Sequence, residues 1–499
     1  MVGAISVVSF CAHAQEEASA SGTGLVLQPT LSVSETFTSN VGLERSSDAR
    51  ADAITDISPG LRLSSRAGRI IGSLDYALHG LVYARRSSAS EVQQALSARG
   101  TAEAIDNWAY VDASASISQQ SISALGTRSV DRNLADGNRS EVSTFQIAPY
   151  VRGPLGSLAD YVLRWGWTGS DSGDSDAKST SNDVSLVLNS GASAFSRLGW
   201  SLSASRQSSE FGNQGSQDAT RFNGQLSFAV TPEFSLLAGG GRERNDYGFS
   251  GQQSTNNWNG GFRWTPSART RLELTRDHRF FGNAYNVRFE HRTPRTVWTF
   301  VDSQDVSTTA GANGTNSPQS VFDLLFAGLA STFPDPVQRA GVVDTFLLDR
   351  GLTRSSLANG GFLTNAPSIQ RRQNLSLALI GVRTTVLLST SRNDARAVDP
   401  SLTDVGDLSN GRNLHSTSFS ANVSHRLTPL SSLNADISQT RNSSTVDDQK
   451  TRLRSLTTTY TTRLSKKVDL SVSARRSLFS SEVDPYTESA VVATLRVQF

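Results

Sequence analysis

Apolar and polar residues alternate with a period of two along most of this chain, and this alternation constrains the fold more than any other feature. From Ile70 to Ala84 every even position is Ile, Gly, Leu, Tyr, Val or Ala, whereas the odd positions include Asp75 and His79. A β-strand points successive side chains to opposite faces, so the pattern predicts strands with one apolar face. The same alternation returns over residues 198–204, 222–230, 258–264 and 468–474.

Two all-β architectures fit such alternation, a soluble sandwich and a transmembrane barrel. The 499 residues contain no run of 18 apolar residues, so no spanning helix is expected. Charged residues make up 18% of the chain, below the ~25% typical of soluble domains. Ser, Thr, Asn, Gln and Gly take their place. If this chain crosses a bilayer, a closed β-barrel is the remaining way to do so.

The connections between the expected strands favour the barrel, because short and long ones take turns along the chain. Several short ones contain Pro, which suits tight turns. Outer-membrane barrels have short periplasmic turns and long external loops. We therefore expect an all-β transmembrane antiparallel β-barrel of about 18–22 strands, with the Pro turns on the periplasmic side. The short set is 152–156, 231–233, 265–267, 293–295 and 428–430, and the long set is 39–53, 119–141, 169–183, 206–218 and 391–413.

The amino-terminal residues have the character of a processing segment. Residues 2–12 are mostly apolar and lead into Ala12-His13-Ala14, an A-x-A cleavage pattern. We expect a signal peptide over residues 1–14, with its basic part missing, and a periplasmic segment over 15–24. The alternatives are a frayed soluble start and a lipoprotein at Cys11, which the bulky Phe10 disfavours. One cysteine rules out a disulfide framework and a cysteine metal site.

The last residues carry the most specific local signal. The apolar residues Leu495, Val497 and Phe499 alternate with polar ones, and the chain ends in an aromatic ring. A terminal aromatic residue on an alternating strand is the mark by which barrel-assembly machinery recognises outer-membrane proteins. The alternative is an ordinary edge strand that happens to end in Phe. The barrel is expected to comprise residues 25–303 and 369–499.

Residues 304–368 interrupt the alternation and contain a helical pattern. Ser317-Pro318 is typical of a helix start, and apolar residues follow at spacings of three and four over 322–329. A second helix is expected from Asp335-Pro336 to Arg350-Gly351. We expect a helical hairpin on the external side, acting as a lid, a plug or a subdomain on the rim. A barrel of about 22 strands would leak if nothing closed it.

Four segments resemble the PEP-CTERM system-associated outer-membrane protein family, which is grouped with β-barrel porins: LQPTLSVSETFTSNVGL (27–43), ITDISPGLRLSSRAGRIIGSLDYALHGLVYAR (54–85), DNWAYVDASASISQQSISALG (106–126) and VFDLLFAGLASTFPDPVQRAGVVDTFL (321–347). The resemblance covers nearly all of the mature chain, and the last segment is its most specific part. It implies an outer-membrane protein encoded with exosortase and exopolysaccharide genes, with a role in polysaccharide export or surface assembly. No catalytic or binding residues come with it.

No signature of an enzyme stands out. The six histidines are not at metal-ligand spacing, and neither HExxH nor GxSxG occurs. A hydrolase using His79 or His425 is the alternative, but no motif selects a serine for it. The chain has 47 Lys and Arg residues and 45 Asp and Glu residues, which gives a net charge of +2. This small charge does not indicate a nucleic-acid-binding protein. We interpret Gly239-Gly240-Gly241 as relief of crowding within a strand, and we expect no enzyme, cofactor or metal.

The polar face of the strands is expected to line a water-filled lumen. Mixed charges among Ser, Thr and Asn would hydrogen-bond sugars or pass hydrophilic solutes. The alternative is simple solvation, with ion pairs that contribute little each. The expected lumen-lining residues are Arg62, Asp75, His79, Asp160, Arg164, Arg271, Glu273, Arg288, Glu290 and Arg475.

Two functions follow for a protein of the bacterial outer membrane. The first is a pore or export component for exopolysaccharide, with its direction set by inner-membrane partners. The second is a structural barrel that anchors matrix or surface proteins without conducting. A soluble β-solenoid is disfavoured because repeats of fixed period are absent. The expected partners are outer-membrane lipid, barrel-assembly machinery, polysaccharide, and periplasmic and inner-membrane export proteins.

Overall fold

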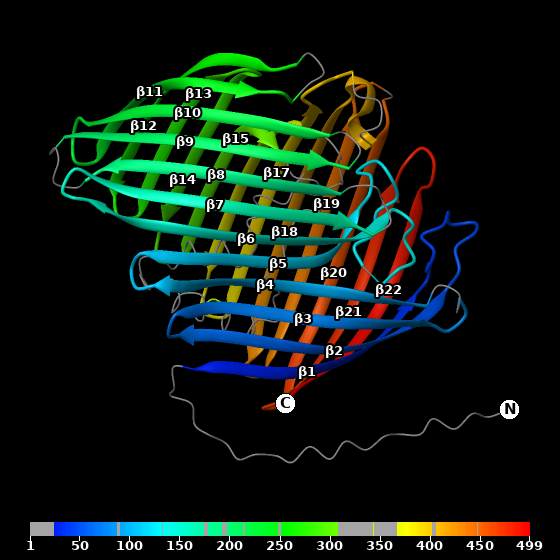
Figure 1. The fold of residues 1–499 in the computed structure, drawn as a ribbon. Coiled ribbons are helices and arrows are strands. Elements are labelled where there is room, and N and C mark those ends of the chain that lie inside the picture. Colours follow the sequence, from blue (N-terminus) through cyan, green and yellow to red (C-terminus); the bar gives the residue numbers. More distant parts are fainter. Residues whose placement is uncertain are drawn as a thin grey trace.

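Twenty-two antiparallel strands form one sheet that closes on itself (Figure 1). In this computed structural model each strand pairs with its neighbours in sequence, and the last strand pairs with the first, with Leu495 opposite Val33. The ring confirms the expected all-β antiparallel barrel, at the upper end of the expected strand number. The structure describes residues 24–86, 90–131, 133–173, 178–191, 197–212, 215–247, 251–307, 343, 367–401, 406–446 and 448–499.

The strands are 10 to 17 residues long, whereas about 9–11 tilted residues suffice to cross a bilayer. They therefore extend beyond the membrane. Their bounds are β1 (Leu25–Thr38), β2 (Asp52–Ala67), β3 (Ile70–Tyr83), β4 (Glu91–Ile105), β5 (Ala109–Ser121), β6 (Arg139–Leu155), β7 (Ala159–Ser172), β8 (Ser179–Ser190), β9 (Leu198–Phe211), β10 (Ser216–Ala229), β11 (Phe234–Asn245), β12 (Gln253–Ser267), β13 (Thr270–Arg279), β14 (Gly282–Arg292), β15 (Thr296–Ser307), β16 (Ser368–Ile380), β17 (Thr384–Ala397), β18 (Asn413–Thr428), β19 (Ser431–Ser444), β20 (Lys450–Ser465), β21 (Val468–Ser480) and β22 (Tyr486–Gln498).

The apolar members of the alternation lie on the outside of the barrel. Val33, Phe222 and Leu456 expose 41, 53 and 49% of their surface, whereas the polar neighbours Ser34 and Ser455 are buried on the inner side. A soluble protein does the reverse with its large apolar side chains. Exposed apolar residues all round a closed barrel are the arrangement of a protein whose outer surface meets lipid.

The longest described connections lie at the opposite end of the barrel from most of the short ones, as the sequence predicted, although the external connection 280–281 has only two residues. Turns 68–69, 268–269, 429–430 and 466–467 lie at the end where β1 begins and β22 finishes, which is the periplasmic end of such barrels. Connections 39–51, 122–138 and 398–412 lie at the external end. The expected long loops were too wide. Residues 206–218, for example, are mostly the ends of β9 and β10. They were expected to form a loop because strand ends that project into water no longer alternate between apolar and polar residues.

Two of the expected Pro turns lie inside strands. Residues 152–155 belong to β6 and residues 265–267 to β12, and each strand ends just before the chain reverses. The register between β12 and β13 shifts between Trp264 and Ser267, on either side of Pro266. Because Pro has no N–H to donate to the ladder, a bulge at the end of a strand accommodates it.

The glycine run of β11 lies where neighbouring backbones approach closely. A Cβ at Gly241 would overlap the carbonyl oxygen of Phe222, and one at Gly239 would overlap that of Gly224. Both belong to β10, the partner strand. These contacts confirm that Gly239 and Gly241 relieve crowding between β10 and β11.

Residues 304–368 were expected to form a helical insertion. Residues 304–307 instead continue β15 and Ser368 begins β16, so the expected borders were too wide by a few residues. Apart from Val343, the two expected helices lie outside the described residues, as do the expected signal peptide and all but the last residue of segment 15–24.

None of the helices in the described part of the chain is both long enough and apolar enough to cross a membrane.

Candidate functional site

The candidate site is the inner face of the barrel together with residues 122–138, the connection between β5 and β6, which we term the crossing segment. All ten residues expected to line the lumen lie on the face opposite the exposed apolar side chains. Among them Arg62 of β2 forms an ion pair with Asp75 of β3, directly across the pair of strands. The neighbouring Leu61 on β2 is exposed on the outer face.

Four of these residues form a charged patch on β13 and β14. Arg271 lies opposite Glu290, and Glu273 lies opposite Arg288. The Glu273 carboxylate also accepts hydrogen bonds from Arg271 at 3.1 Å and from Arg263 of β12 at 3.4 Å. Charges of opposite sign therefore face each other across the strands, so this part of the inner wall is hydrophilic but has little net charge.

An aromatic and charged cluster lies on the inner faces of β5, β6 and β7. The rings of Tyr110 and Tyr150 stack with centroids 5.1 Å apart, and the guanidinium of Arg152 lies 4.5 Å from the Tyr110 centroid. Arg164, expected in the lumen, lies 5.3 Å from the Tyr150 centroid and forms an ion pair with Asp112 at 2.8 Å. Sequence reasoning missed the two tyrosines, although both occupy the polar phase of the alternation.

The remaining expected residues lie at different heights on the wall. Asp160 of β7 lies opposite Asn189 of β8, near the periplasmic turns. His79 of β3 lies towards the external end, where its Nδ1 atom is 3.0 Å from Asp56 and 2.9 Å from Ser58. No group of three or more His, Cys, Asp or Glu side chains that could hold a metal occurs in the described ranges.

The crossing segment corrects an expectation, because residues 119–141 were expected to be an external loop. It folds instead across the mouth of the barrel, where its residues meet inward-facing side chains. The carbonyl of Ala124 accepts a hydrogen bond from Asn442 Nδ2 of β19 at 2.5 Å. Asn442 belongs to β19, which is not a sheet neighbour of β5 or β6, so this contact joins parts of the wall that lie apart in the strand order.

One end of the crossing segment docks on the connection between β17 and β18. That connection contains the 3-10 turn η2 (Gly406–Gly411), in which Asp407 accepts hydrogen bonds from Ser123 Oγ and from the Ala124 N–H, both at 2.6 Å. Ala124 also packs in a buried apolar cluster with Leu408 and Leu414. The scattered apolar residues of the segment give no periodic pattern, so sequence reasoning did not detect this docking.

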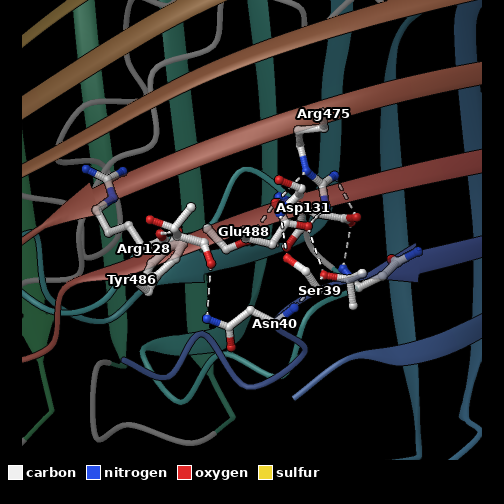
Figure 2. A network of polar contacts seen from close by, with 12 residues as sticks. Ser39, Asn40, Arg128, Asp131, Arg475, Tyr486 and Glu488 are labelled. Carbon is white, nitrogen blue, oxygen red and sulfur yellow. Dashed lines mark hydrogen bonds and ion pairs between the residues drawn. The ribbon is translucent and has the colours of Figure 1, made fainter. Parts of the chain in front are cut away.

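The middle of the crossing segment is fixed by a buried ion network (Figure 2). Arg475 of β21 lies between Asp131 of the segment and Glu488 of β22, with an N–O distance of 2.8 Å to each carboxylate. The arginine side chain is 8% exposed and that of Glu488 is 0% exposed. Thr38 of β1 donates a further hydrogen bond to Glu488 at 3.0 Å. Arg475 was expected in the lumen, but its tie to the segment was not.

The far side of the crossing segment contacts β3, β22 and the connection that follows β1. Tyr83 donates from its hydroxyl to the carbonyl of Asn133 at 2.7 Å, and the Ala135 N–H donates to the carbonyl of Val41 at 3.1 Å. Leu134 is buried in an apolar cluster with both Val41 and Tyr83. The Tyr486 hydroxyl donates to the carbonyl of Arg128. Polar and apolar contacts therefore hold both halves of the segment against the wall.

Burial shifts the titration of charged groups in these connections. It raises the pKa of Asp407 above the usual carboxyl range, against the opposing effect of hydrogen bonds from Ser123 and Ala124. Burial likewise raises the pKa of Asp136. The same desolvation lowers the pKa of Arg128. Burial at the docked segment therefore disfavours the charged forms of Asp136 and Arg128 in the segment and of Asp407 in the connection on which it docks.

Beside the crossing segment, the external mouth contains a cavity of about 540 Å³. Its lining includes Tyr247, Phe280 and Phe281 together with Arg396 and Asp399. Below it Arg279 is buried between Glu243 and Asp305 and lies 5.1 Å from the Phe281 ring. Aromatic rings beside charged groups at a solvent-accessible opening are the kind of surface that can bind a polyhydroxylated ligand.

The comparisons with known proteins concern solved structures alone, since no protein-family model and no curated protein matches the sequence. The FrpB iron transporter of Neisseria meningitidis is 10% identical, with a TM-score of 0.49, over 95% of this chain and 82% of that one. The ferric-catecholate import receptor Fiu of E. coli is 9% identical, with a TM-score of 0.48, over 94 and 81%. The Pseudomonas aeruginosa outer-membrane protein opdK is 10% identical, with a TM-score of 0.37, over 95 and 99%.

The geometry of the barrel itself sets its location. A closed ring of 22 strands with an apolar outer face, short turns at one end and longer connections at the other is built to cross a membrane with strands. Barrels of this kind belong to the bacterial outer membrane. The chain is therefore an outer-membrane β-barrel with a polar inner face and a segment folded across its external mouth.

Proposed function

We propose that this protein is an outer-membrane pore or export component through which exopolysaccharide passes, in a PEP-CTERM/exosortase system. The observation that supports this proposal most is the inner wall, which is built from hydroxyl and amide side chains and from charges that are mostly paired. On β18 and β19 alone the buried inward residues include Ser418, Ser420, Asn422, Ser432, Asn434 and Asn442. These side chains are covered in the structure. Where such a surface is uncovered, it exchanges hydrogen bonds with water or with sugar hydroxyls at little cost.

Two aromatic features lie along this route. The stacked pair of Tyr110 and Tyr150 belongs to the periplasmic half of the wall, and the cavity beside Tyr247 and Phe280 is at the external mouth. A sugar ring has apolar C–H faces that stack on aromatic rings, while its hydroxyls bond to neighbouring polar groups. A polymer of sugars would therefore find a contact near each end of the barrel.

The crossing segment acts as a gate in this proposal. Its attachments are hydrogen bonds of about 1 kcal/mol each, one ion network and two small apolar clusters. None of these is a backbone bond between paired strands, so the segment can leave the wall without unfolding the strands. Inner-membrane and periplasmic partners set the direction of transport, and barrel-assembly machinery recognises Leu495, Val497 and Phe499. Neither a catalytic step nor a cofactor is involved.

Conductance in planar bilayers tests the pore. The full chain is compared with a variant in which residues 123–137 are replaced by a short Gly-Ser linker, and with a second variant that lacks residues 304–368. We expect the first replacement to raise the single-channel conductance at least about twofold, because it removes a segment that lies inside the external mouth of the barrel. A barrel that carries no current in any of the three forms, or in a double deletion, contradicts the proposal.

Polymer transport has its own test. Deletion of the gene should cause polysaccharide to accumulate in the periplasm. Addition of the polymer should interrupt the current through the purified barrel. Tyr150→Ala should weaken this block several-fold, whereas Tyr460→Ala, on the outer face of β20, should leave it unchanged. Equal block by the polymer in both variants would argue against a sugar contact at the tyrosine pair.

A second candidate is a structural barrel that anchors matrix or surface proteins without conducting. The buried network of Asp131, Arg475 and Glu488 favours it, because that network holds the segment across the mouth. A structural barrel predicts no current from the gate-deleted forms and no polymer in the periplasm of a deletion strain, together with loss of surface matrix. The same two measurements therefore separate the two functions.

A further inference from the structure

The outer face of β19 and β20 carries arginines placed directly against one another. Arg441 and Arg452 are partners across the antiparallel pair, and Arg454 lies two residues further along the same face of β20. Both neighbouring guanidinium groups repel Arg452. Like charges directly opposite destabilise a sheet. Among the residues that the structure describes, no carboxylate pairs with Arg441 or Arg452, so nothing in the described chain compensates this repulsion.

An apolar hollow lies on the same outer face, towards the membrane centre. It has a volume of about 460 Å³ and is lined chiefly by Phe419, Ile437, Leu456 and Leu478, together with Arg454 and Arg476. These four side chains are among the exposed large apolar residues of the barrel. Other arginines lie on the outer face, such as Arg206, which is paired with Asp218. Here, by contrast, Arg441 and Arg452 lie directly opposite each other beside an apolar hollow.

The height of the arginines on the barrel is informative. Arg441 lies ten residues beyond Ser431, the periplasmic start of β19, which is about 33 Å along a strand. At a tilt of ~40° this corresponds to about 25 Å along the barrel axis, the height of the lipid-facing band of such barrels. The arginines therefore lie where the acyl chains of the external leaflet end and its head groups begin.

We propose that Arg441, Arg452 and Arg454 bind the phosphate groups of a multiply acylated, phosphorylated glycolipid of the external leaflet, whose acyl chains fill the hollow below. Charge complementarity selects this occupant, since phosphate compensates three clustered guanidinium groups and a zwitterionic lipid does not. Arginine holds phosphate oxygens with two parallel hydrogen bonds. Removal from bulk water strengthens those bonds at the membrane surface.

Neighbouring polar side chains support this geometry. Arg454 donates from Nε to the Gln439 side-chain oxygen at 3.2 Å, and Arg476 donates from Nη1 to Ser489 Oγ at 3.0 Å. Each bond fixes the plane of a guanidinium group and leaves other N–H groups free to meet a ligand. The site needs only the folded barrel in its membrane, so it does not depend on whether the lumen conducts.

Native mass spectrometry on the full chain in detergent tests the site. The probes are diphosphoryl lipid A, monophosphoryl lipid A and phosphatidylethanolamine, with inorganic phosphate as a competitor. A triple variant carries Arg441→Gln, Arg452→Gln and Arg454→Gln. The matched control is Arg206→Gln on the outer face of β9, where the arginine is already paired with Asp218. Heat-dependent gel mobility reports whether each variant is a folded barrel.

We expect diphosphoryl lipid A to bind best, the triple variant to bind it about tenfold more weakly or worse, and the control to bind it normally. Without lipid the triple variant should unfold at the same temperature as the parent or a higher one, because repulsion is removed. Equal affinity of the triple variant and the parent overturns the proposal. Equal binding of phosphatidylethanolamine, or full competition by millimolar inorganic phosphate, overturns the glycolipid as the ligand.

Discussion

At the scale of single residues, Arg475 is the position where the wall and the crossing segment depend most on one side chain. Its guanidinium lies between Asp131 and Glu488, and Glu488 has no exposed surface. Replacement by Gln leaves a buried carboxylate without its partner. We expect Arg475→Gln to lower the free energy of unfolding by about 3–5 kcal/mol, measured by urea denaturation in detergent.

The control for Arg475 is an ion pair of similar chemistry in water. Arg69 and Asp106 form such a pair at the periplasmic turns, and both are well exposed. Arg69→Gln should therefore cost at most about 1 kcal/mol. The double variant of Arg475→Gln with Glu488→Gln should regain part of the lost stability, since it removes the uncompensated charge. Equal losses for Arg475→Gln and Arg69→Gln would show that the network is not what fixes the segment.

Gly241 offers a second test at this scale. A side chain there would overlap the Phe222 carbonyl of the partner strand, whereas a Cβ at Gly260 on β12 would find its nearest neighbour 4.0 Å away. Gly241→Ala should destabilise the barrel by about 1–3 kcal/mol, and Gly260→Ala should be close to neutral. Refolding yield and urea midpoint check this, and a neutral Gly241→Ala would contradict the close approach of β10 and β11.

The sequence predicted individual positions best where they follow the strand period. Arg62, Asp75 and Arg164 were placed on the inner face by parity alone, because a strand allows only two directions for a side chain. The partners Asp56, Asp112 and Glu488 were not identified, since they depend on the register between nearby strands, which parity alone does not fix. Tyr110 and Tyr150 could have been found from the same parity, since both lie on the inner face.

At the scale of elements, strand positions followed from alternation and the crossing segment did not. Residues 119–141 are rich in Ser, Asn and Asp, which is equally typical of a loop in water and of a loop held by hydrogen bonds inside a wet barrel. The difference lies in partners on β3, β19, β21 and β22, about which local composition carries no information. The same limit applies to the helical pattern over 317–350, which stays a prediction.

Docking of the crossing segment should depend on pH. Burial raises the pKa of Asp407, which faces Arg412 and Arg128 as well as its partners Ser123 and Ala124. The docked state therefore binds the proton more tightly than the released state. The contribution of this group is full below the usual carboxyl range near ~4 and is lost as the pH rises through the raised value. Asp136 acts in the same direction.

We therefore expect the amides of residues 123–127 to exchange hydrogen more slowly at about pH 5 than at about pH 7.5, after correction for intrinsic exchange. Asp407→Asn keeps an acceptor for one of the two donors and removes the charge, so it should reduce this difference. Asp160→Asn, on the inner face far from the segment, should leave it unchanged. Slower exchange at the higher pH would reverse the sign of the argument and contradict it.

At the scale of the whole molecule, closure into an antiparallel barrel was the most predictable property, whereas the strand number was predicted only as a range of about 18–22. Alternation, turn chemistry and the sorting of connections all indicate one answer, and the pairing of β22 with β1 completes it. What passes through the barrel is less predictable, since transport depends on the width, charge and closure of a lumen that many distant residues build together.

The last prediction concerns the charge of that lumen. On β13 and β14 the two arginines Arg271 and Arg288 face Glu290 and Glu273, so the patch has little net charge and the wall should discriminate weakly between ions. Removing both arginines leaves two carboxylates facing the water, which attract cations and repel anions. If the barrel conducts, Arg271→Ala with Arg288→Ala should shift the reversal potential in a KCl gradient towards cation selectivity, and Glu273→Gln with Glu290→Gln should shift it the opposite way. An outward-facing control, Arg206→Ala, should not change it. Reversal potentials that are the same in all three variants would mean that these strands do not line the conducting path.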